Sequence, residues 1–162
     1  MSSRIRIAVI YGGRSSEHSI SCISAGAIRR ALDPDRYDVV PIGITRDGGW
    51  YLQVTDPQDL RIVDGVLPEV RANDLPVTFH ADPSLVDERI GHLDVVFPVL
   101  HGPYGEDGTV QGLFELAGIP YVGSGVLASA VAMDKGYMKA LFASAGLGVG
   151  PYAVITDHQW RT

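Results

Sequence analysis

Polar side chains gather in the stretch His101–Thr109, which contains three glycines, a histidine, a glutamate and an aspartate. It follows the apolar run Val95–Leu100, which is typical of a strand buried on both faces, and ligands usually contact the loops at which such strands end. The glycines allow sharp turns and a close approach of the backbone to a ligand. A lone His101 would more simply be a structural residue. Because Glu106 and Asp107 accompany it in one glycine-rich turn at a helix N-terminus, we predict that a ligand binds there.

A second polar turn, Gly12–Glu17, follows another short apolar run, Ile5–Tyr11. The turn lacks the third glycine of a dinucleotide fingerprint and the Lys-Ser/Thr ending of a phosphate-binding loop, so neither nucleotide motif is predicted. Ser15 or Ser16 suits the N-cap of a following helix, and Glu17 suits a first-turn carboxylate that interacts well with the helix dipole. On the residues alone, this structural interpretation is simpler than a ligand-binding one.

Each polar turn precedes a helix. Apolar residues recur at steps of three and four from Ile20 to Leu32, before Asp33-Pro34, and again from Val110 to Ala117, before Gly118. Strand–helix units of this kind predict parallel pairing with right-handed crossovers. We therefore expect an α/β fold in which residues 1–122 form a small doubly wound parallel sheet. For His18, which lies between the first turn and its helix, we expect a structural role.

The segment between the two units is less regular. Tyr37–Ile44 predicts a second strand, and Pro41 within it suggests an edge or a bulge because proline cannot donate to a ladder. Trp50–Leu52 is expected to pair back as a hairpin. Residues 53–92 are interrupted by prolines and Asn/Asp pairs, so we expect a surface excursion with at most one short strand at Val77–Phe79.

Residues 123–125, Gly-Ser-Gly, have the composition of a hinge. Apolar residues after it predict one helix of roughly 20 residues from Val126 to Ala145, and Tyr152–Ile155 predicts the start of a strand. Lys135 lies within the helical part beside Lys139, where the residues alone favour a solvated lysine.

Composition limits the classes of protein that this chain can belong to. The 162 residues are 46% hydrophobic and 20% charged, which suits one globular domain and part of another. A formal net charge of −6 argues against a nucleic-acid or anionic-membrane partner, since both need a basic face. We expect a soluble protein with no signal peptide and no membrane span. The single Cys22 excludes an internal disulfide and favours the cytoplasm.

The residues from His101 to Gly125 strongly resemble the D-alanine-D-alanine ligases of peptidoglycan synthesis. Gly12–Glu17 and Met133–Lys135 also match motifs of that family, and the resemblance covers nearly the whole chain, with residues 53–92 its weakest part. It implies a Rossmann-like pre-ATP-grasp domain over residues 1–122 and the beginning of an ATP-grasp domain over 123–162.

The same resemblance implies a reaction that needs ATP and Mg²⁺. The carboxylate of one D-alanine would be phosphorylated to an acyl phosphate, which the amine of a second D-alanine attacks. Lys135 matches a lysine that contacts nucleotide phosphate. The Mg²⁺ ligands and most ATP contacts are expected beyond Thr162, so this chain alone is expected to be inactive.

The resemblance also assigns roles in the site. Glu17 matches the carboxylate that receives the ammonium of the first D-alanine, with Ser16 and Gly102 lining the substrate. His101 would lie beside the substrate and orient it, and Glu106 would fix the imidazole from behind.

Two alternatives share these motifs. A D-alanine-D-lactate ligase of the vancomycin-resistance type would differ only in residues outside this chain. A non-catalytic binding or assembly domain would use the loops only to pair subunits. In the family the N-terminal domain forms a homodimer, so a homodimer through this region is expected, while the residues themselves show no interface.

Overall fold

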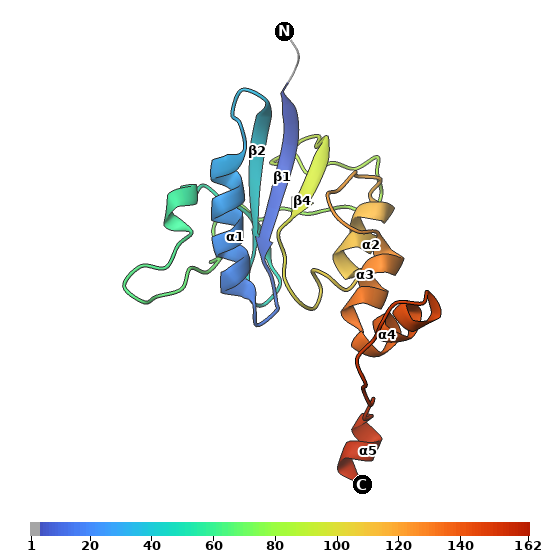
Figure 1. The fold of residues 1–162 in the computed structure, drawn as a ribbon. Helices are drawn as coiled ribbons and strands as arrows, with labels where there is room; N and C mark the ends of the chain where they lie inside the picture. Colours follow the sequence, from blue (N-terminus) through green and yellow to red (C-terminus); the bar gives the residue numbers. More distant parts are fainter. Residues whose placement is uncertain (1–3) are drawn as a thin grey trace.

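Four strands form one mixed sheet in the computed structural model, which describes residues 4–162 (Figure 1). The strands are β1 (Ile5–Gly12), β2 (Tyr37–Ile44), β3 (Trp50–Leu52) and β4 (Val95–Pro98), in the order β3-β2-β1-β4. β1 pairs in parallel with both β2 and β4, whereas β3 pairs antiparallel with β2. The sheet is therefore mostly parallel, with the expected hairpin strand at one edge.

Two helices cover opposite faces of this sheet. Helix α1 (His18–Ala31) follows β1, and helix α2 (Thr109–Leu116) follows the loop after β4 (Figure 1). Because successive side chains of a strand point to opposite faces, β1 supplies both cores. Ala8 and Ile10 pack in the core that contains Phe114 of α2, and Val9 and Tyr11 pack in the core that contains Cys22 of α1. The expected α/β architecture with helices on both faces is confirmed.

The expectation that Pro41 marks an edge or a bulge is wrong. β2 lies inside the sheet, and Pro41 is in register with Val9 of β1 without interruption. The Pro41 carbonyl accepts a hydrogen bond from the N–H of Gln53, so this residue directs its backbone groups toward β3. The nitrogen of Pro41 faces the same side as its carbonyl, away from β1, so the missing N–H breaks no hydrogen bond between β2 and β1.

Residues 53–92 contain one short 3₁₀ helix, η1 (Pro57–Asp59), and no strand. At the expected strand Val77–Phe79, only the preceding Pro76 forms an isolated bridge, to Tyr51. The segment is also more than a surface excursion, because four of its apolar side chains are buried in the two cores: Leu60, Val70, Val77 and Ile90.

The C-terminal region differs from the single long helix that we expected. It forms α3 (Val126–Met133), α4 (Lys135–Ser144) and α5 (Asp157–Arg161). Asp134 separates the first two because its backbone is extended and its carboxylate accepts hydrogen bonds from the N–H groups of Gly136 and Tyr137. A side chain that caps a new helix in this way competes with continuation of the old one.

The strand expected at Tyr152–Ile155 is also wrong, since these residues form neither helix nor strand. All four residues are exposed, and no strand among residues 4–162 pairs with them. In the part of the chain that the structure describes, no helix is both long and apolar enough to cross a membrane.

Candidate active site

The two polar turns predicted from the sequence meet at the carboxyl ends of β1 and β4. The strands are adjacent and parallel, so the loops that follow them leave the sheet at the same edge. Ser21 of α1 links their ends, since its hydroxyl accepts from the N–H of Gly12 at 2.8 Å and donates to the carbonyl of Val99 at 2.6 Å. Ser21 is fully buried, so this link is shielded from water.

Glu17 lies at the N-cap position of α1, but its side chain does not cap the helix. Instead, Ser15 Oγ accepts a hydrogen bond from the Glu17 N–H at 3.1 Å. A Cβ atom placed on Gly102 would lie 3.2 Å from Glu17 Oε2 and 2.6 Å from Ser15 Oγ. The exposed Glu17 carboxylate therefore lies directly beside Gly102, and only glycine fits there. Ser16, the neighbouring expected contact, is exposed at the same turn.

His18 has the structural role that we expected. Its ring is fully buried, with Nδ1 2.7 Å from the Gly13 carbonyl and Nε2 accepting from the Val70 N–H at 2.9 Å. Because Nε2 accepts, the proton is on Nδ1, which donates to Gly13. The imidazole thus fastens the first polar turn to the irregular segment 53–92.

The loop after β4 is held by its own carboxylates. Glu106 Oε2 accepts from the Gly102 N–H at 2.7 Å, while Asp107 accepts from the N–H groups of Tyr104 and Thr109 at 2.8 and 3.0 Å. Partial burial acts to raise the pKa of Asp107, but these backbone hydrogen bonds outweigh it and leave the pKa below its ordinary value. Asp107 therefore has a structural task in this loop.

His101 contacts a residue that the sequence did not suggest. Its Nε2 lies 3.2 Å from Ser24 Oγ on α1, and no hydrogen bond joins it to Glu106 within residues 4–162. The expected support of the imidazole by Glu106 is thus replaced by Ser24. His101, Ser24 and Glu106 line an open groove of about 730 Å³, together with Ser124 and Ser129.

Gln111 also faces this groove and was missed by sequence reasoning. Its Nε2 donates to the Gly105 carbonyl at 2.8 Å, while its buried Oε1 has no hydrogen-bond partner among the described residues. A glutamine in the first turn of an amphipathic helix gives no signal of such a role, because polar residues are common there.

Arg14 and Tyr104 form the other rim of the site. The Arg14 guanidinium lies 4.8 Å from the centroid of the Tyr104 ring, and Tyr104 adopts a positive φ of 69°. A small, mostly apolar pocket of about 180 Å³ lies between this pair and Trp50. His101 borders both this pocket and the larger groove, together with its neighbours Leu100 and Gly105.

The charge balance of the site favours a cation. Within residues 4–162, the salt bridges join Arg6 to Asp38, Arg71 to Glu69 and Arg161 to Asp157, and none involves Glu17 or Glu106. The three ion pairs are remote from the two loops along the chain. An ammonium group placed between the loops would meet the carboxylates of Glu17 and Glu106, while Arg14, the cation of these loops, lies over the Tyr104 ring at the other rim.

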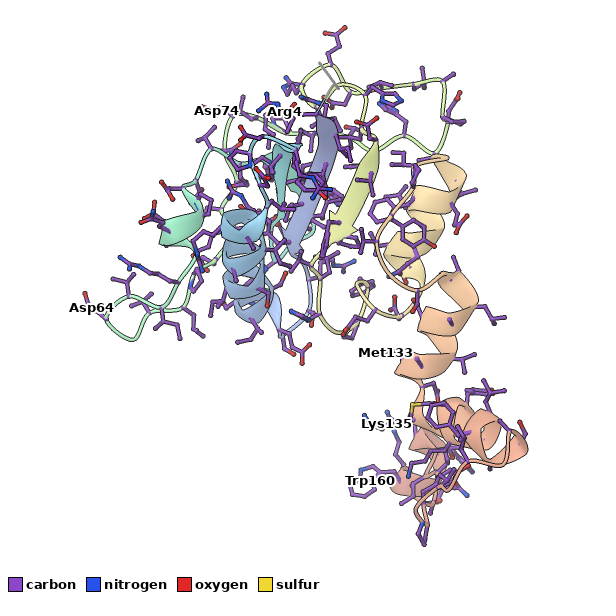
Figure 2. The ribbon with its side chains drawn as sticks, turned by 45° about the horizontal axis from the view of Figure 1, so that its top comes forward. Arg4, Asp64, Asp74, Met133, Lys135 and Trp160 are labelled. Atoms are coloured by element: carbon purple, nitrogen blue, oxygen red, sulfur yellow. The ribbon has the colours of Figure 1, made fainter. Side chains whose placement is uncertain are left out.

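Lys135 is not brought to these loops. It begins α4, away from the sheet, near Met133 and with Trp160 beyond it (Figure 2). There it lines a separate cavity of about 470 Å³ with Lys139 and Tyr152, and the Lys139 ammonium lies 4.8 Å from the centroid of the Tyr152 ring. Two ammonium groups at one cavity fit a phosphate. No cluster of three or more metal-ligating side chains occurs in the described part of the chain, so it does not fit Mg²⁺ by itself.

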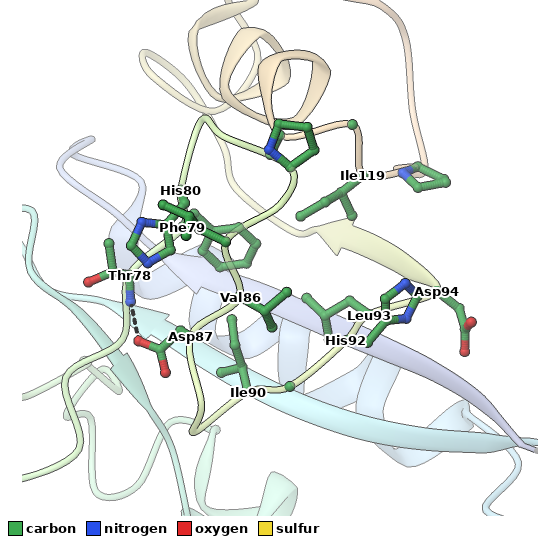
Figure 3. Close-up of a pocket in the computed structure, with 16 residues that line it drawn as sticks. Thr78, Phe79, His80, Val86, Asp87, Ile90, His92, Leu93, Asp94 and Ile119 are labelled. Carbon is green, nitrogen blue, oxygen red and sulfur yellow. Dashed lines mark hydrogen bonds between the residues drawn. The ribbon is translucent and has the colours of Figure 1, made fainter.

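Another cavity, of about 340 Å³, lies at the opposite end of β4. Figure 3 shows apolar side chains such as Val86, Ile90 and Ile119 around it, with His80 and His92 nearby. The Asp87 carboxylate on its wall already accepts hydrogen bonds from the N–H groups of residues 78 and 89. This cavity offers little chemistry, and the loop site remains the candidate active site.

Comparison with known proteins agrees with the geometry. The family model described as the D-Ala D-Ala ligase N-terminus matches residues 6–124, which include both polar turns and the sheet that positions them. The chain belongs to this D-alanine-D-alanine ligase family. The match ends at the hinge-like residues 123–125, so the helices α3 to α5 lie outside it.

Relatives in this family are longer than the chain. The D-alanine-D-alanine ligase of Streptomyces avermitilis is 54% identical, over 96% of this chain and 44% of the relative. Among solved structures, the VanG D-Ala:D-Ser ligase from Enterococcus faecalis is 40% identical with a TM-score of 0.77, over 91% of this chain and 43% of that one. The Bacillus anthracis D-alanine-D-alanine ligase complexed with ATP is 32% identical with a TM-score of 0.58, over 90% and 36%. The chain thus spans less than half the length of these relatives.

Proposed function

We propose that this chain is the N-terminal part of an enzyme that ligates two D-alanine molecules to D-alanyl-D-alanine in an ATP-dependent reaction for peptidoglycan precursor synthesis. The observation that carries the proposal is the exposed Glu17 carboxylate, which lies beside Gly102, does not cap α1 and forms no salt bridge within residues 4–162. A free carboxylate next to a glycine backbone suits the ammonium of a small amino acid.

The proposed chemistry is mainly one of positioning two small zwitterions. ATP, when bound, supplies the phosphoryl group that converts one D-alanine carboxylate to an acyl phosphate. Glu17 holds the ammonium of the first D-alanine, with Ser16 and Gly102 beside it. His101 orients the substrate from the groove wall. Glu106 acts on the loop backbone, since its carboxylate holds the Gly102 N–H in place.

The remaining assignments extend this proposal to the C-terminal region. We assign residues 1–122 to the substrate-binding domain and 123–162 to the beginning of an ATP-grasp domain, with Lys135 contacting nucleotide phosphate. The two lysines at the α4 cavity support that role, and the ATP complex of the Bacillus anthracis relative supports ATP as the cofactor. Mg²⁺ is proposed to bind residues beyond Thr162.

The choice of second substrate is the closest alternative. The VanG relative is named as a D-Ala:D-Ser ligase and shares this fold at 40% identity, so the fold does not distinguish second substrates. A D-alanine-D-lactate or D-alanine-D-serine ligase would use the same Glu17 and His101. We propose D-alanine because the relative with the highest identity of the three reported above, at 54%, is named a D-alanine-D-alanine ligase.

Two further features belong to the proposal. We infer a homodimer through the N-terminal domain. The alternative function, a non-catalytic assembly domain, predicts that the complete protein binds neither D-alanine nor ATP. We also propose the cytoplasm as compartment, because the reaction uses ATP and Cys22 is a buried free thiol.

The substitution Glu17→Gln in the complete protein tests the proposal, since residues 1–162 alone are expected not to turn over ATP. Glutamine keeps the size and a hydrogen-bond acceptor but removes the charge that faces the ammonium. We expect kcat/KM for D-alanine to fall roughly thirtyfold, which corresponds to about 2 kcal/mol, while the KM for ATP hardly changes.

Glu88→Gln is the matched control, because Glu88 is exposed in the segment 53–92, remote from the two loops. It should leave both kinetic constants within about twofold. Unchanged D-alanine kinetics in Glu17→Gln, with a normal melting temperature, would make Glu17 a structural residue and remove the support for this site.

A further inference from the structure

Two serines on one face of α1 serve the two loops of the candidate site. Ser21 joins the ends of β1 and β4 through its buried hydroxyl. Ser24 lies three residues further along, which in a helix places it on the same face. Its hydroxyl reaches His101, which is 77 positions away in the sequence. The helix therefore carries hydroxyl groups where it passes the site.

The direction of the hydrogen bond between Ser24 and His101 depends on the tautomer of the ring. Within residues 4–162, Ser24 Oγ lies 3.2 Å from His101 Nε2, and its hydroxyl can donate to that nitrogen or accept from it. When Ser24 donates, Nε2 must be the unprotonated nitrogen of the ring, and the proton is on Nδ1. Nδ1 has no hydrogen-bond partner among the same residues, so its N–H is free for a ligand.

We propose that Ser24 is a positioning residue that fixes the tautomer of His101, so that the imidazole presents an Nδ1–H donor to the carboxylate of the bound amino acid. This inference rests on the function proposed above. A donor at this place can hydrogen-bond a carboxylate, whereas the opposite tautomer would turn a lone pair toward it. Fixing the ring through its second nitrogen is how histidine ligands are commonly oriented.

The location of Ser24 is consistent with this role. Ser24 is partly exposed and lines the same groove of about 730 Å³ as His101, so its hydroxyl lies at the wall of the site and outside the packed core. A substitution here therefore changes the groove wall with little effect on packing. The open groove also leaves room for the extra methyl group of threonine, which makes a conservative variant available.

The test uses the complete enzyme with ¹⁵N-labelled histidine and the variants Ser24→Ala and Ser24→Thr. Nitrogen NMR distinguishes protonated from unprotonated ring nitrogens, and His101→Gln assigns the signals. We expect wild type and Ser24→Thr to carry the proton on Nδ1, and Ser24→Ala to show both tautomers. The KM for D-alanine should rise about fivefold in Ser24→Ala and recover in Ser24→Thr, with the KM for ATP changed less than twofold.

Ser19→Ala is the control on the same helix, because its hydroxyl accepts from Arg46 and does not contact His101. It should leave the His101 signals and the KM for D-alanine unchanged. A wild-type proton on Nε2, or identical His101 signals in wild type and Ser24→Ala, would overturn the proposal. If the wild type shows no D-alanine-dependent phosphate release, the proposed function fails, and the spectra still support or overturn Ser24 as the residue that positions His101.

Discussion

Residues 4–122 and residues 123–162 have similar apolar sequence patterns but very different environments. Phe114 of α2 is fully buried between the sheet and the aromatic rings of Phe79 and Tyr121, whereas Phe142 of α4 is 41% exposed. The buried apolar side chains all lie at or before Ala117, while Leu127, Tyr137 and Trp160 are each more than 70% exposed.

The difference shows that a helical apolar pattern predicts a helix but not its burial. Helix α2 lies against the sheet beside it, so its apolar stripe is removed from water. Helices α3 and α4 contact mainly each other. An apolar stripe contributes to the free energy of unfolding only in proportion to the area that a partner covers.

The substitution with the largest expected effect tests that difference directly. Phe114→Ala should lower the free energy of unfolding by about 3 to 5 kcal/mol, because it opens a cavity in the core. Phe142→Ala removes the same atoms from a half-exposed position and should cost about 1 kcal/mol or less. Urea denaturation followed by circular dichroism measures both, and equal costs would show that α4 is packed as firmly as α2.

A smaller effect is expected where the loops join the sheet. Ser21→Ala leaves the buried Gly12 N–H and Val99 carbonyl without their partner, which should lower the free energy of unfolding by about 2 kcal/mol. Ser144→Ala removes an exposed hydroxyl that donates to the Leu141 carbonyl in α4 and should change it by about 0.5 kcal/mol or less. Faster amide exchange at Gly12 in Ser21→Ala would locate the loss, and its absence would contradict the link.

The smallest expected effect is on how the free energy of unfolding depends on pH. The pKa of Asp107 is lowered in the folded chain, so its ionised form stabilises the fold above its unfolded pKa of about 3.9, and this contribution is lost as the pH falls through the folded pKa. Asp107→Asn should therefore cost about 1 kcal/mol at pH 7 and less at pH 3. Denaturation curves at both pH values test this. As the control, Asp157→Asn in the exposed α5 should lower the free energy of unfolding by about 0.5 kcal/mol or less at pH 7. An equal loss at both pH values in Asp107→Asn would contradict a stabilising role for the ionised Asp107 carboxylate.

Local patterns were enough to predict most elements of the sheet domain. β1, β2 and β3 begin and end within a residue of the predicted ranges, because alternation, β-branched residues and turn residues act over short distances. The same reasoning failed at Pro41 and Asp134. Pro41 is tolerated inside the sheet because the ladder between β2 and β3 begins only at residue 42. Asp134 ends α3 because it caps α4.

Sequence reasoning also identified the two loops of the site, because polar residues after buried strands and glycines at tight turns are local features. The amino-acid sequence by itself therefore determined the four strands of the sheet, helices α1 and α2, and the residue types that each loop presents. Only the tertiary structure decided that Ser24 contacts His101, that His18 binds Val70, and that Glu17 lies free beside Gly102. These contacts join residues 52 to 85 positions apart. Contacts of that span depend on how α1 packs against the sheet, which no local pattern encodes.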